Sequence, residues 1–193
     1  MIRYELERYA LRDIEEDDLP QLLEWRNSPR IHSKMLTDHK ITWDEHVAWF
    51  NRIKDDPIKK HFVFTYDGTP VGYSSCHGLN LERRTSYGGA YIGALDKCPK
   101  DAGIFLFYMG IDNVFSNYDI ALSESKVLAD NKRVLRLNKV FGYEFDPSKD
   151  QYIEKDGERK LVVYGTLTRD RWLALRDQLV DRFQLGATRT GGL

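Results

Sequence analysis

The chain has 193 residues, a length that suits one domain with a sizeable hydrophobic core, and we expect that domain to cover residues 1–185. Its formal net charge of -1 and its 31% of charged residues are ordinary for a globular protein, and they give no general argument for a nucleic-acid or membrane partner. Two cysteines are too few for a disulfide framework or a zinc site, and no segment is apolar for long enough to span a bilayer. We therefore expect a cytoplasmic protein without a metal, ending in a disordered tail over residues 186–193.

The N-terminal residues predict one strand and one helix. The strand covers residues 9–14, and the helix that follows has an apolar stripe that ends in Arg26. Pro29 disfavours helix in the residue before it, so the helix stops there. An arginine at the end of an apolar stripe either snorkels to solvent or points into a cleft, and both interpretations stay open for Arg26.

A polar loop over residues 30–40 leads to a second predicted helix. Thr42 and Glu45 have the spacing of a capping box, which fixes the start of that helix. His46 lies on its apolar inner face, where a histidine is more often a hydrogen-bonded core residue than a catalytic one.

The middle of the chain predicts an antiparallel meander of three strands, at residues 61–66, 71–77 and 85–95. The third strand carries Gly88, Gly89 and Gly93. Glycine inside a strand indicates a bulge, or the close approach of a ligand or another backbone. Three of them in one strand favour a ligand site.

The stretch from Tyr91 to Gly110 predicts the end of a strand, a turn and the start of a strongly apolar helix. Ala102 and Gly103 place almost no side chain before the helix N-terminus, whose unpaired N–H groups and partial positive charge suit an anion. Lys100 adds a full charge. This pattern indicates either a pyrophosphate site or an ordinary strand-to-helix connection.

Beyond this helix, residues 120–128 alternate as a strand with Glu124 near its middle, and the helical crossover predicts that it runs parallel to its neighbour. Asn131 caps a further helix, in which Asn138 lies on a face that should be buried and needs a polar partner. The remaining predicted elements are strands at 143–145, 151–154 and 160–167 and a helix over 168–184.

This order of elements predicts an α/β (α+β) fold with a mixed, mostly antiparallel central sheet, splayed in the middle and flanked by helices. With these residues assembled, the chain from about residue 9 to 167 resembles the GNAT superfamily of acetyl-CoA-dependent N-acetyltransferases. Residues 128–143, LADNKRVLRLNKVFGY, are similar to the Asn-x-x-(Ala/Val) to Gly-(Phe/Tyr) segment of that superfamily. The sequences WRN at 25–27 and WDEHVAWF at 43–50 resemble the acetyltransferases of pseudaminic acid biosynthesis, whose substrate is a UDP-linked 4-amino-4,6-dideoxy sugar.

The resemblance implies acetyl-CoA as cosubstrate and direct acyl transfer to an amine. The cofactor-binding residues that it implies are Ile92, Gly93, Leu95, Lys100, Asp101, Ala102, Gly103, Ile104 and Asn131. The implied substrate-binding residues are Arg26, Asn27, Met35, His46 and Tyr91. The implied catalytic residues are Glu124 as a base, Tyr91 for orienting the substrate, and Asn138. Alternatively, Glu124 forms an ion pair with Lys126 or Lys132.

Two residues depart from the pattern of the superfamily. Asn138 stands where many members have a tyrosine acid, and an amide can donate a hydrogen bond to sulfur but is a poor proton source. Asp101 stands where many members have glycine, and a carboxylate beside a pyrophosphate is unfavourable unless it points away or caps the helix.

Three functions remain open from the sequence. They are N-acetylation of a nucleotide-linked amino sugar, N-acetylation of protein N-termini or other small amines, and acyl-CoA binding by a non-catalytic GNAT module. A peptide acceptor needs an open groove, whereas a nucleotide sugar needs a closed basic pocket. The long late strands and the terminal helix leave a homodimer open.

Overall fold

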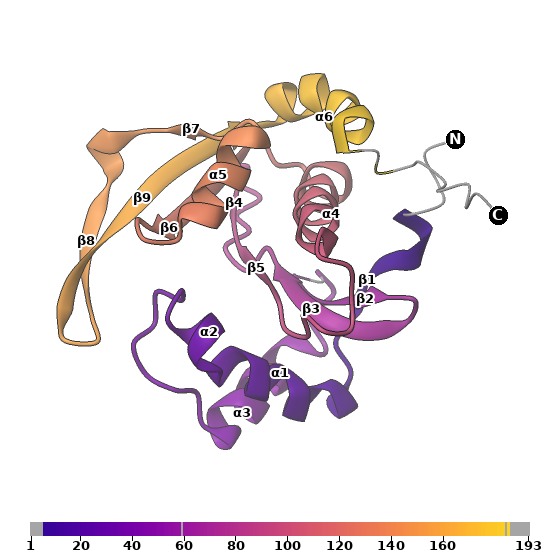
Figure 1. The fold of residues 1–193 in the computed structure, drawn as a ribbon, viewed down its shortest axis with the longest axis vertical. Helices are drawn as coiled ribbons and strands as arrows, with labels where there is room; N and C mark the ends of the chain where they lie inside the picture. Colours follow the sequence, from indigo (N-terminus) through magenta and orange to yellow (C-terminus); the bar gives the residue numbers. More distant parts are fainter. Residues whose placement is uncertain (1–5, 59, 184, 186–193) are drawn as a thin grey trace.

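The computed structural model describes residues 6–58, 60–183 and 185, and it arranges them in two sheets with helices on either side (Figure 1). The predicted tail over 186–193 lies outside the described residues. Four antiparallel strands form the N-terminal sheet, in the order β1 (Tyr9–Asp13), β2 (His61–Tyr66), β3 (Thr69–Ser75) and β5 (Gly89–Ile92). Successive side chains of β2 point to opposite faces, so Val63 packs on the N-terminal helices and Phe64 packs beneath α4.

The C-terminal sheet is built around one long strand, β9 (Glu158–Thr168). The sheet has the order β4 (Thr85–Tyr87), β6 (Leu122–Leu128), β9 and β7 (Glu144–Phe145), and β8 (Gln151–Lys155) also pairs with β9. β6 runs parallel to β4, as predicted for a strand reached through a helical crossover, and the other pairings in this sheet are antiparallel. The predicted α/β fold with a mostly antiparallel, splayed sheet is confirmed.

The helices are α1 (Leu19–Asn27), α2 (Pro29–His32), α3 (Trp43–Ile53), α4 (Ala102–Asn117), α5 (Lys132–Val140) and α6 (Arg169–Phe183). Short 3-10 turns cover Leu6–Arg8, Glu16–Asp18 and Pro147–Lys149. The predicted capping box of α3 is present, since Thr42 and Glu45 exchange side-chain and backbone hydrogen bonds. The prediction of a loop over 30–40 is wrong at its start, because Pro29 begins the short helix α2, and proline is favourable in a first helical turn. Among the described residues, none of the helices is long and apolar enough to cross a membrane.

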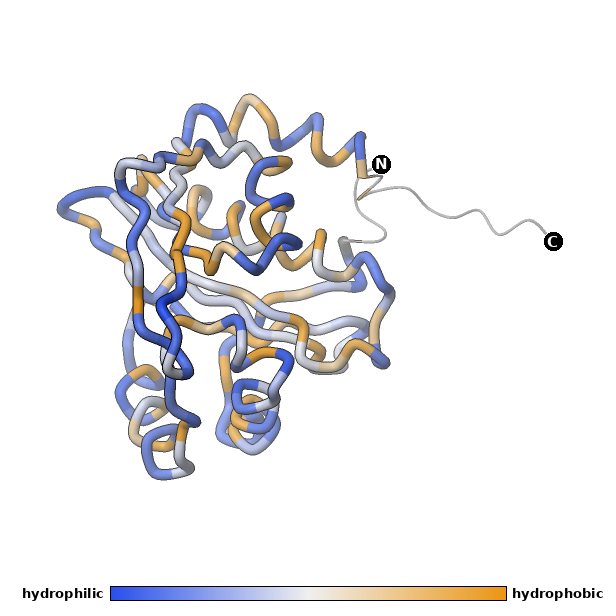
Figure 2. Tube along the Cα trace, turned by 60° about the vertical axis from the view of Figure 1, so that its left-hand side comes forward, coloured by the Kyte–Doolittle hydropathy of each residue, from blue (hydrophilic) through white to orange (hydrophobic). Residues whose placement is uncertain are grey.

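Helix α4 joins the cores of the two sheets. Hydrophobic residues dominate its sequence, whereas the tip of the β8–β9 hairpin, residues 154–160, is hydrophilic (Figure 2). Phe105 and Leu106 pack on the N-terminal sheet, while Phe115 packs with Trp172 of α6 in the core of the C-terminal sheet. A helix that is apolar all round is buried in this way because it has a partner on each side.

The strand predicted over 85–95 is in fact two strands in different sheets. β4 belongs to the C-terminal sheet and β5 to the N-terminal sheet, and the chain passes between them at Gly88. A Cβ at Gly88 would lie 1.8 Å from the Ser75 carbonyl oxygen, closer than any real contact. Glycine is therefore required here by the approach of the neighbouring backbone, and the ligand-site interpretation of Gly88 is wrong.

Gly88→Ala should lower the free energy of unfolding by about 1–3 kcal/mol, because the Ser75 carbonyl is backbone and cannot rotate away from an added methyl group. The matched control is Gly89→Ala, since a Cβ there meets nothing within 4 Å. The control should change stability by less than about 0.5 kcal/mol. Urea denaturation measures both values, and equal losses in the two variants would contradict this account of the strand switch.

Candidate active site

The two sheets diverge between β5 and β6, and the candidate site is built on this splay. β5 pairs with β3, while β6 pairs with β4 and β9. The N–H of Gly93 donates to the carbonyl of Val71 in β3 at 2.8 Å. Neighbouring residues of a strand turn their main-chain groups to opposite edges, so the N–H and C=O of Ile92 point toward the splay. A ligand lying in the splay could pair with such groups as an added strand does.

Arg30 of α2 holds the end of β5. Its Nη2 donates to the carbonyl oxygens of Ile92 at 2.9 Å and of Gly93 at 2.8 Å. The resemblance assigned Ile92 and Gly93 to the cofactor, and the carbonyls of both are already hydrogen-bonded within the protein. The sequence placed Arg30 only in a polar loop and gave no sign of this contact.

Strand β5 ends at Ile92, earlier than the strand predicted over residues 85–95. The strand stops at Ile92, because Gly93 and Ala94 both donate their N–H to a single carbonyl of β3. A Cβ at Gly93 would lie 2.0 Å from the Trp25 ring, so this glycine makes room for the packing of α1 on the sheet. Leu95 lies outside the strand and is 53% exposed.

Helix α4 begins directly after the turn that the sequence assigned to a pyrophosphate. Asp101 occupies the N-cap position, but its side chain makes no capping hydrogen bond. The N–H groups of Ala102 and Ile104 donate within the turn, to the carbonyls of Pro99 at 3.0 Å and Asp101 at 2.7 Å. Lys100 and Asp101 are exposed. The turn keeps the small residues and the helix dipole of an anion site, but it offers fewer unpaired N–H groups than expected.

A cation that the sequence analysis did not single out stands beside the first turn of α4. A Cβ at Gly103 would lie 3.9 Å from Nη2 of Arg133 on α5, so this guanidinium adds a full charge near the helix N-terminus. Asn131 caps α5 as predicted, because its Oδ1 accepts from the N–H of Val134 at 3.5 Å. Its role as a cofactor contact stays a prediction.

Asn138 has the polar partner that its burial requires. The side chain is 1% exposed, and its Nδ2 donates to Oγ of Ser125 on β6 at 2.6 Å. This contact gives Asn138 a structural role between α5 and β6. A hydrogen bond from it to a sulfur stays a prediction, and Ser125 is a polar group of this region that the sequence analysis missed.

Glu124 lies on the face of β6 opposite to Ser125, since side chains alternate along a strand. Tyr164 of β9 donates its hydroxyl to Glu124 Oε1 at 2.5 Å. Burial, and next the bond to Glu124, raise the pKa of Tyr164 to about 12, so its hydroxyl stays protonated at neutral pH. The alternative ion pairs of Glu124 with Lys126 or Lys132 are absent from the described residues, and Lys126 instead lies over an aromatic ring of β4.

Arg26 is an inward-pointing cation with an unsatisfied group. Its Nη2 donates to Oγ1 of Thr37, whereas its Nη1 is buried without a hydrogen-bond partner among the described residues. Burial lowers the pKa of Arg26, and the stacked rings of Tyr73 and Tyr91, 5.2 Å apart, are close enough to act on it. A buried guanidinium nitrogen without a hydrogen-bond partner is costly, so Nη1 favours the interpretation of Arg26 as a cation that binds an anion.

Tyr91 packs against Tyr73 within the same region. Nδ1 of His61 lies 2.7 Å from the hydroxyl of Tyr73. Burial lowers the pKa of His61 to about 4 and raises the pKa of Tyr91. Both groups are therefore neutral at neutral pH, which suits Tyr91 to hydrogen bonding rather than to proton abstraction.

His46 is a buried residue, as its position on the inner face of α3 predicts. It is 7% exposed and stacks on Trp49 at 5.1 Å, and burial lowers its pKa. Its Nε2 nevertheless has no hydrogen-bond partner in the described part of the chain. A substrate contact by His46 stays a prediction.

Two predicted substrate residues have structural roles. Asn27 uses both ends of its amide on the backbone of Ile41, donating from Nδ2 at 2.7 Å and accepting at Oδ1 at 2.9 Å. Met35 packs against the cluster that contains Trp25 and Ile31. Both side chains therefore stabilise the packing of the N-terminal helices. Their contact with substrate stays a prediction.

The loop over residues 33–42, here called the bridging loop, connects α2 to α3 and contacts the β8–β9 hairpin of the C-terminal sheet (Figure 1). Lys34 forms an ion pair with Asp130 at 3.1 Å, just before α5. At the β8–β9 turn, Lys155 Nζ donates to the Thr37 carbonyl at 3.1 Å. In addition, the N–H of Asp156 donates to Asp38 at 2.7 Å. Lys155 is fully buried, so the contact between loop and hairpin is a packed one.

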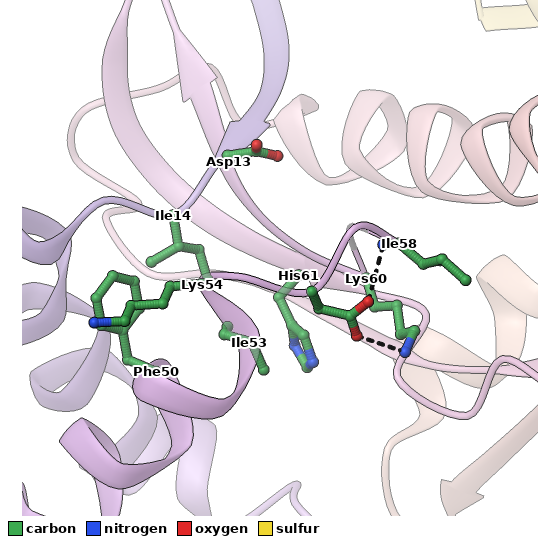
Figure 3. Close-up of a pocket in the computed structure, with 9 residues that line it drawn as sticks. Asp13, Ile14, Phe50, Ile53, Lys54, Ile58, Lys60 and His61 are labelled. Carbon is green, nitrogen blue, oxygen red and sulfur yellow. Dashed lines mark hydrogen bonds and ion pairs between the residues drawn. The ribbon is translucent and has the colours of Figure 1, made fainter.

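Two cavities are lined by none of the predicted catalytic residues Glu124, Tyr91 and Asn138. One lies between α3 and the start of β2, beside Ile53 and His61, and its volume of about 20 Å³ admits about one water molecule (Figure 3). A second, of about 110 Å³, lies beside Asp18 and Trp25. In the described part of the chain, no three His, Cys, Asp or Glu side chains gather as a metal site.

Comparison with known proteins identifies the fold. No protein-family model matches the chain. Among curated proteins, the acetyltransferase PseH of Campylobacter jejuni is 24% identical over 141 residues, which span 72% of this chain and 86% of PseH.

Solved structures with the same fold include N-acetyltransferases. Spermidine N-acetyltransferase from Vibrio cholerae, in complex with CoA and spermine, superposes with a TM-score of 0.76 at 18% identity, over 86% of this chain and 99% of that one. An N-acetyltransferase from Staphylococcus aureus Mu50 gives a TM-score of 0.69 at 18% identity, over 83% of this chain and 98% of that one. A third structure, yncA from Salmonella typhimurium with its cofactor acetyl-CoA, gives 0.68 at 18% identity, over 84% of this chain and 95% of that one. The GNAT fold predicted from the sequence is confirmed, and the chain resembles PseH.

Proposed function

We propose that this chain is an acetyl-CoA-dependent N-acetyltransferase whose acceptor is a small amine that carries an anionic group, specifically a nucleotide-linked amino sugar. The fold and the likeness to PseH support the transferase activity. The observation that carries the choice of acceptor is Arg26, whose buried Nη1 lacks a partner among the described residues. A phosphate oxygen would supply that partner through a charge-assisted hydrogen bond.

The residues present fit acetyl-CoA along the splay. The N–H of Ile92 would pair with the pantetheine, and the N-terminus of α4 with Arg133 would hold the pyrophosphate. Acetyl-CoA supplies a thioester carbonyl for attack by the amine. Glu124 would take the proton that the amine loses, and the hydroxyl of Ser125, held by Asn138, would lie near the departing thiolate.

Two observations disfavour the other acceptors. The bridging loop is tied to the β8–β9 hairpin by Lys155 and Asp38, which restricts an extended peptide. A polyamine carries several positive charges, and the positive charge of Arg26 would repel it. The non-catalytic alternative rests on Asp101 and Asn138, the two departures from the superfamily pattern.

The test is a free-thiol release assay with acetyl-CoA and three classes of amine. A UDP-linked 4-amino sugar should turn over, while spermidine and N-terminal peptides should be poor acceptors. Turnover with peptides or spermidine alone would contradict the acceptor proposed here. Calorimetry with acetyl-CoA separates the non-catalytic alternative, which predicts binding without thiol release for every amine.

Asp101→Asn should tighten the binding of CoA by about 2–5-fold, since an exposed charge near a helix N-terminus changes the binding free energy of an anion there by up to about 1 kcal/mol. The gain should shrink at high salt, because an exposed charge is screened. The matched control is Asp96→Asn, which removes an exposed carboxylate before the turn. Calorimetric titration measures the change, and equal affinity of Asp101→Asn and wild type would show that this carboxylate points away from the cofactor.

A further inference from the structure

One neighbour holds the carboxylate of Glu124. Tyr164 is 8% exposed, and its hydroxyl donates to Glu124 Oε1 at 2.5 Å. In the register of β6 and β9, Glu124 lies opposite Thr166, so Tyr164 is the diagonal neighbour on the same face. The contact is therefore made between two strands whose pairing is continuous from Leu122 to Leu128.

Tyr164 is itself held in place. Its backbone N–H donates to Oδ1 of Asp150 at 2.8 Å, and its carbonyl accepts from the N–H of Asp146 at 3.1 Å. The ammonium of Lys149 lies 5.1 Å from the centroid of its ring. The pairing of β9 and the contacts with Asp150 and Asp146 fix the backbone of Tyr164, and Lys149 lies over its ring. These contacts favour the orientation in which the hydroxyl points toward Glu124.

We propose that Tyr164 is a positioning residue that binds Oε1 of Glu124 and leaves Oε2 to accept the proton of the acceptor amine. This inference rests on the proposed function, which supplies the amine. In the step, the amine nitrogen forms the bond to the acetyl carbon, the carbon–sulfur bond breaks, and the amine proton passes to Oε2 directly or through a water.

Other titratable and charged groups lie near this pair in the described structure. Tyr87 of β4 and Lys126 of β6 lie beside Glu124, and Lys149 and Asp146 lie behind Tyr164. Lys149 and Asp146 pair with each other at 3.6 Å, so their charges largely offset one another. Removing the Tyr164 hydroxyl changes none of these four side chains, so its effect reports on the bond between Tyr164 and Glu124.

The first experiment compares Tyr164→Phe with Tyr143→Phe. The control removes a hydroxyl that lies 3.0 Å from that of Ser123, next to Glu124 in sequence but on the other face of β6. In Tyr164→Phe kcat should fall about 10-fold while both KM values stay the same, the size expected for losing one hydrogen bond to a charged group that orients the base. In Tyr143→Phe both kcat and KM should stay unchanged. An unchanged kcat in Tyr164→Phe would reduce Tyr164 to a structural residue.

The second experiment does not depend on turnover. Carboxyl ¹³C NMR at neutral pH, with the Glu124 signal assigned from Glu124→Gln, compares wild type with Tyr164→Phe. A Glu124 signal that moves in Tyr164→Phe and stays in place in Tyr143→Phe supports the positioning role, and superimposable signals overturn it. If the wild type releases no thiol with any amine, the proposed function fails, while this comparison still decides whether the Tyr164 hydroxyl binds the Glu124 carboxylate.

Discussion

Glu124→Gln should lower kcat for acetyl transfer by about 10²–10³-fold, because a positioned general base contributes an effect of that size. Glutamine keeps an oxygen that can accept the Tyr164 hydrogen bond, so the variant should lose the proton acceptor and keep the local structure. The pH dependence of the rate should lose its acidic limb. Free-thiol release at saturating acetyl-CoA, measured across pH, tests both effects.

The matched control is Glu154→Gln on β8, an exposed glutamate of the same sheet. It should leave kcat and the pH profile unchanged. A Glu124→Gln enzyme with the pH profile of the wild type would remove Glu124 as the base. In that case, the bond between Tyr164 and Glu124 would be a link between strands and nothing more.

Arg26→Met should raise KM for the nucleotide-linked acceptor by about 10–100-fold, the loss expected for one hydrogen bond between charged groups. The KM for acetyl-CoA should stay the same, since the groups proposed to hold that cofactor are the N–H of Ile92, the N-terminus of α4 and Arg133. Methionine fills a similar space without a charge. The free energy of unfolding should change by less than about 1 kcal/mol, because the substitution removes both the buried Nη1 that lacks a partner and the hydrogen bond of Nη2 to Thr37.

The combination of lost affinity and retained stability separates a binding arginine from a structural one. Arg52→Gln, which changes an exposed arginine in the last turn of α3, is the control for a general loss of positive charge from these helices. It should leave both KM values unchanged. An Arg26→Met variant that unfolds more easily while keeping its KM would contradict the assignment of Arg26 to the acceptor.

The elements that the sequence predicted well are those with local causes. The capping box at Thr42 and Glu45 spans one helical turn, and the strand at 61–66 has the bounds of β2. The same holds for the cap at Asn131 and for the apolar helix after residue 101. Each depends on residues within about four positions of one another, which a pattern in the sequence contains.

The errors occur where a distant contact decides the structure. At Gly88, where one strand ends and the chain passes to another, the backbone of Ser75 leaves no room for a side chain. At Gly93, the ring of Trp25 leaves no room for one. The amide of Asn27 holds the backbone of Ile41, a contact 14 residues away that no local pattern predicts, and its contact with substrate stays a prediction. No local pattern separates a glycine or an asparagine that meets a ligand from one that meets its own chain.

The sequence predicted the GNAT fold, most of the order of its elements and some of the polar residues from which a site can be built. The tertiary structure decided which of those residues have partners. It placed Tyr164 on Glu124, Ser125 on Asn138 and Arg30 on the end of β5, and it left one nitrogen of Arg26 unpaired among the described residues. Strand register and burial, which fix such partners, arise from contacts between residues far apart in the chain.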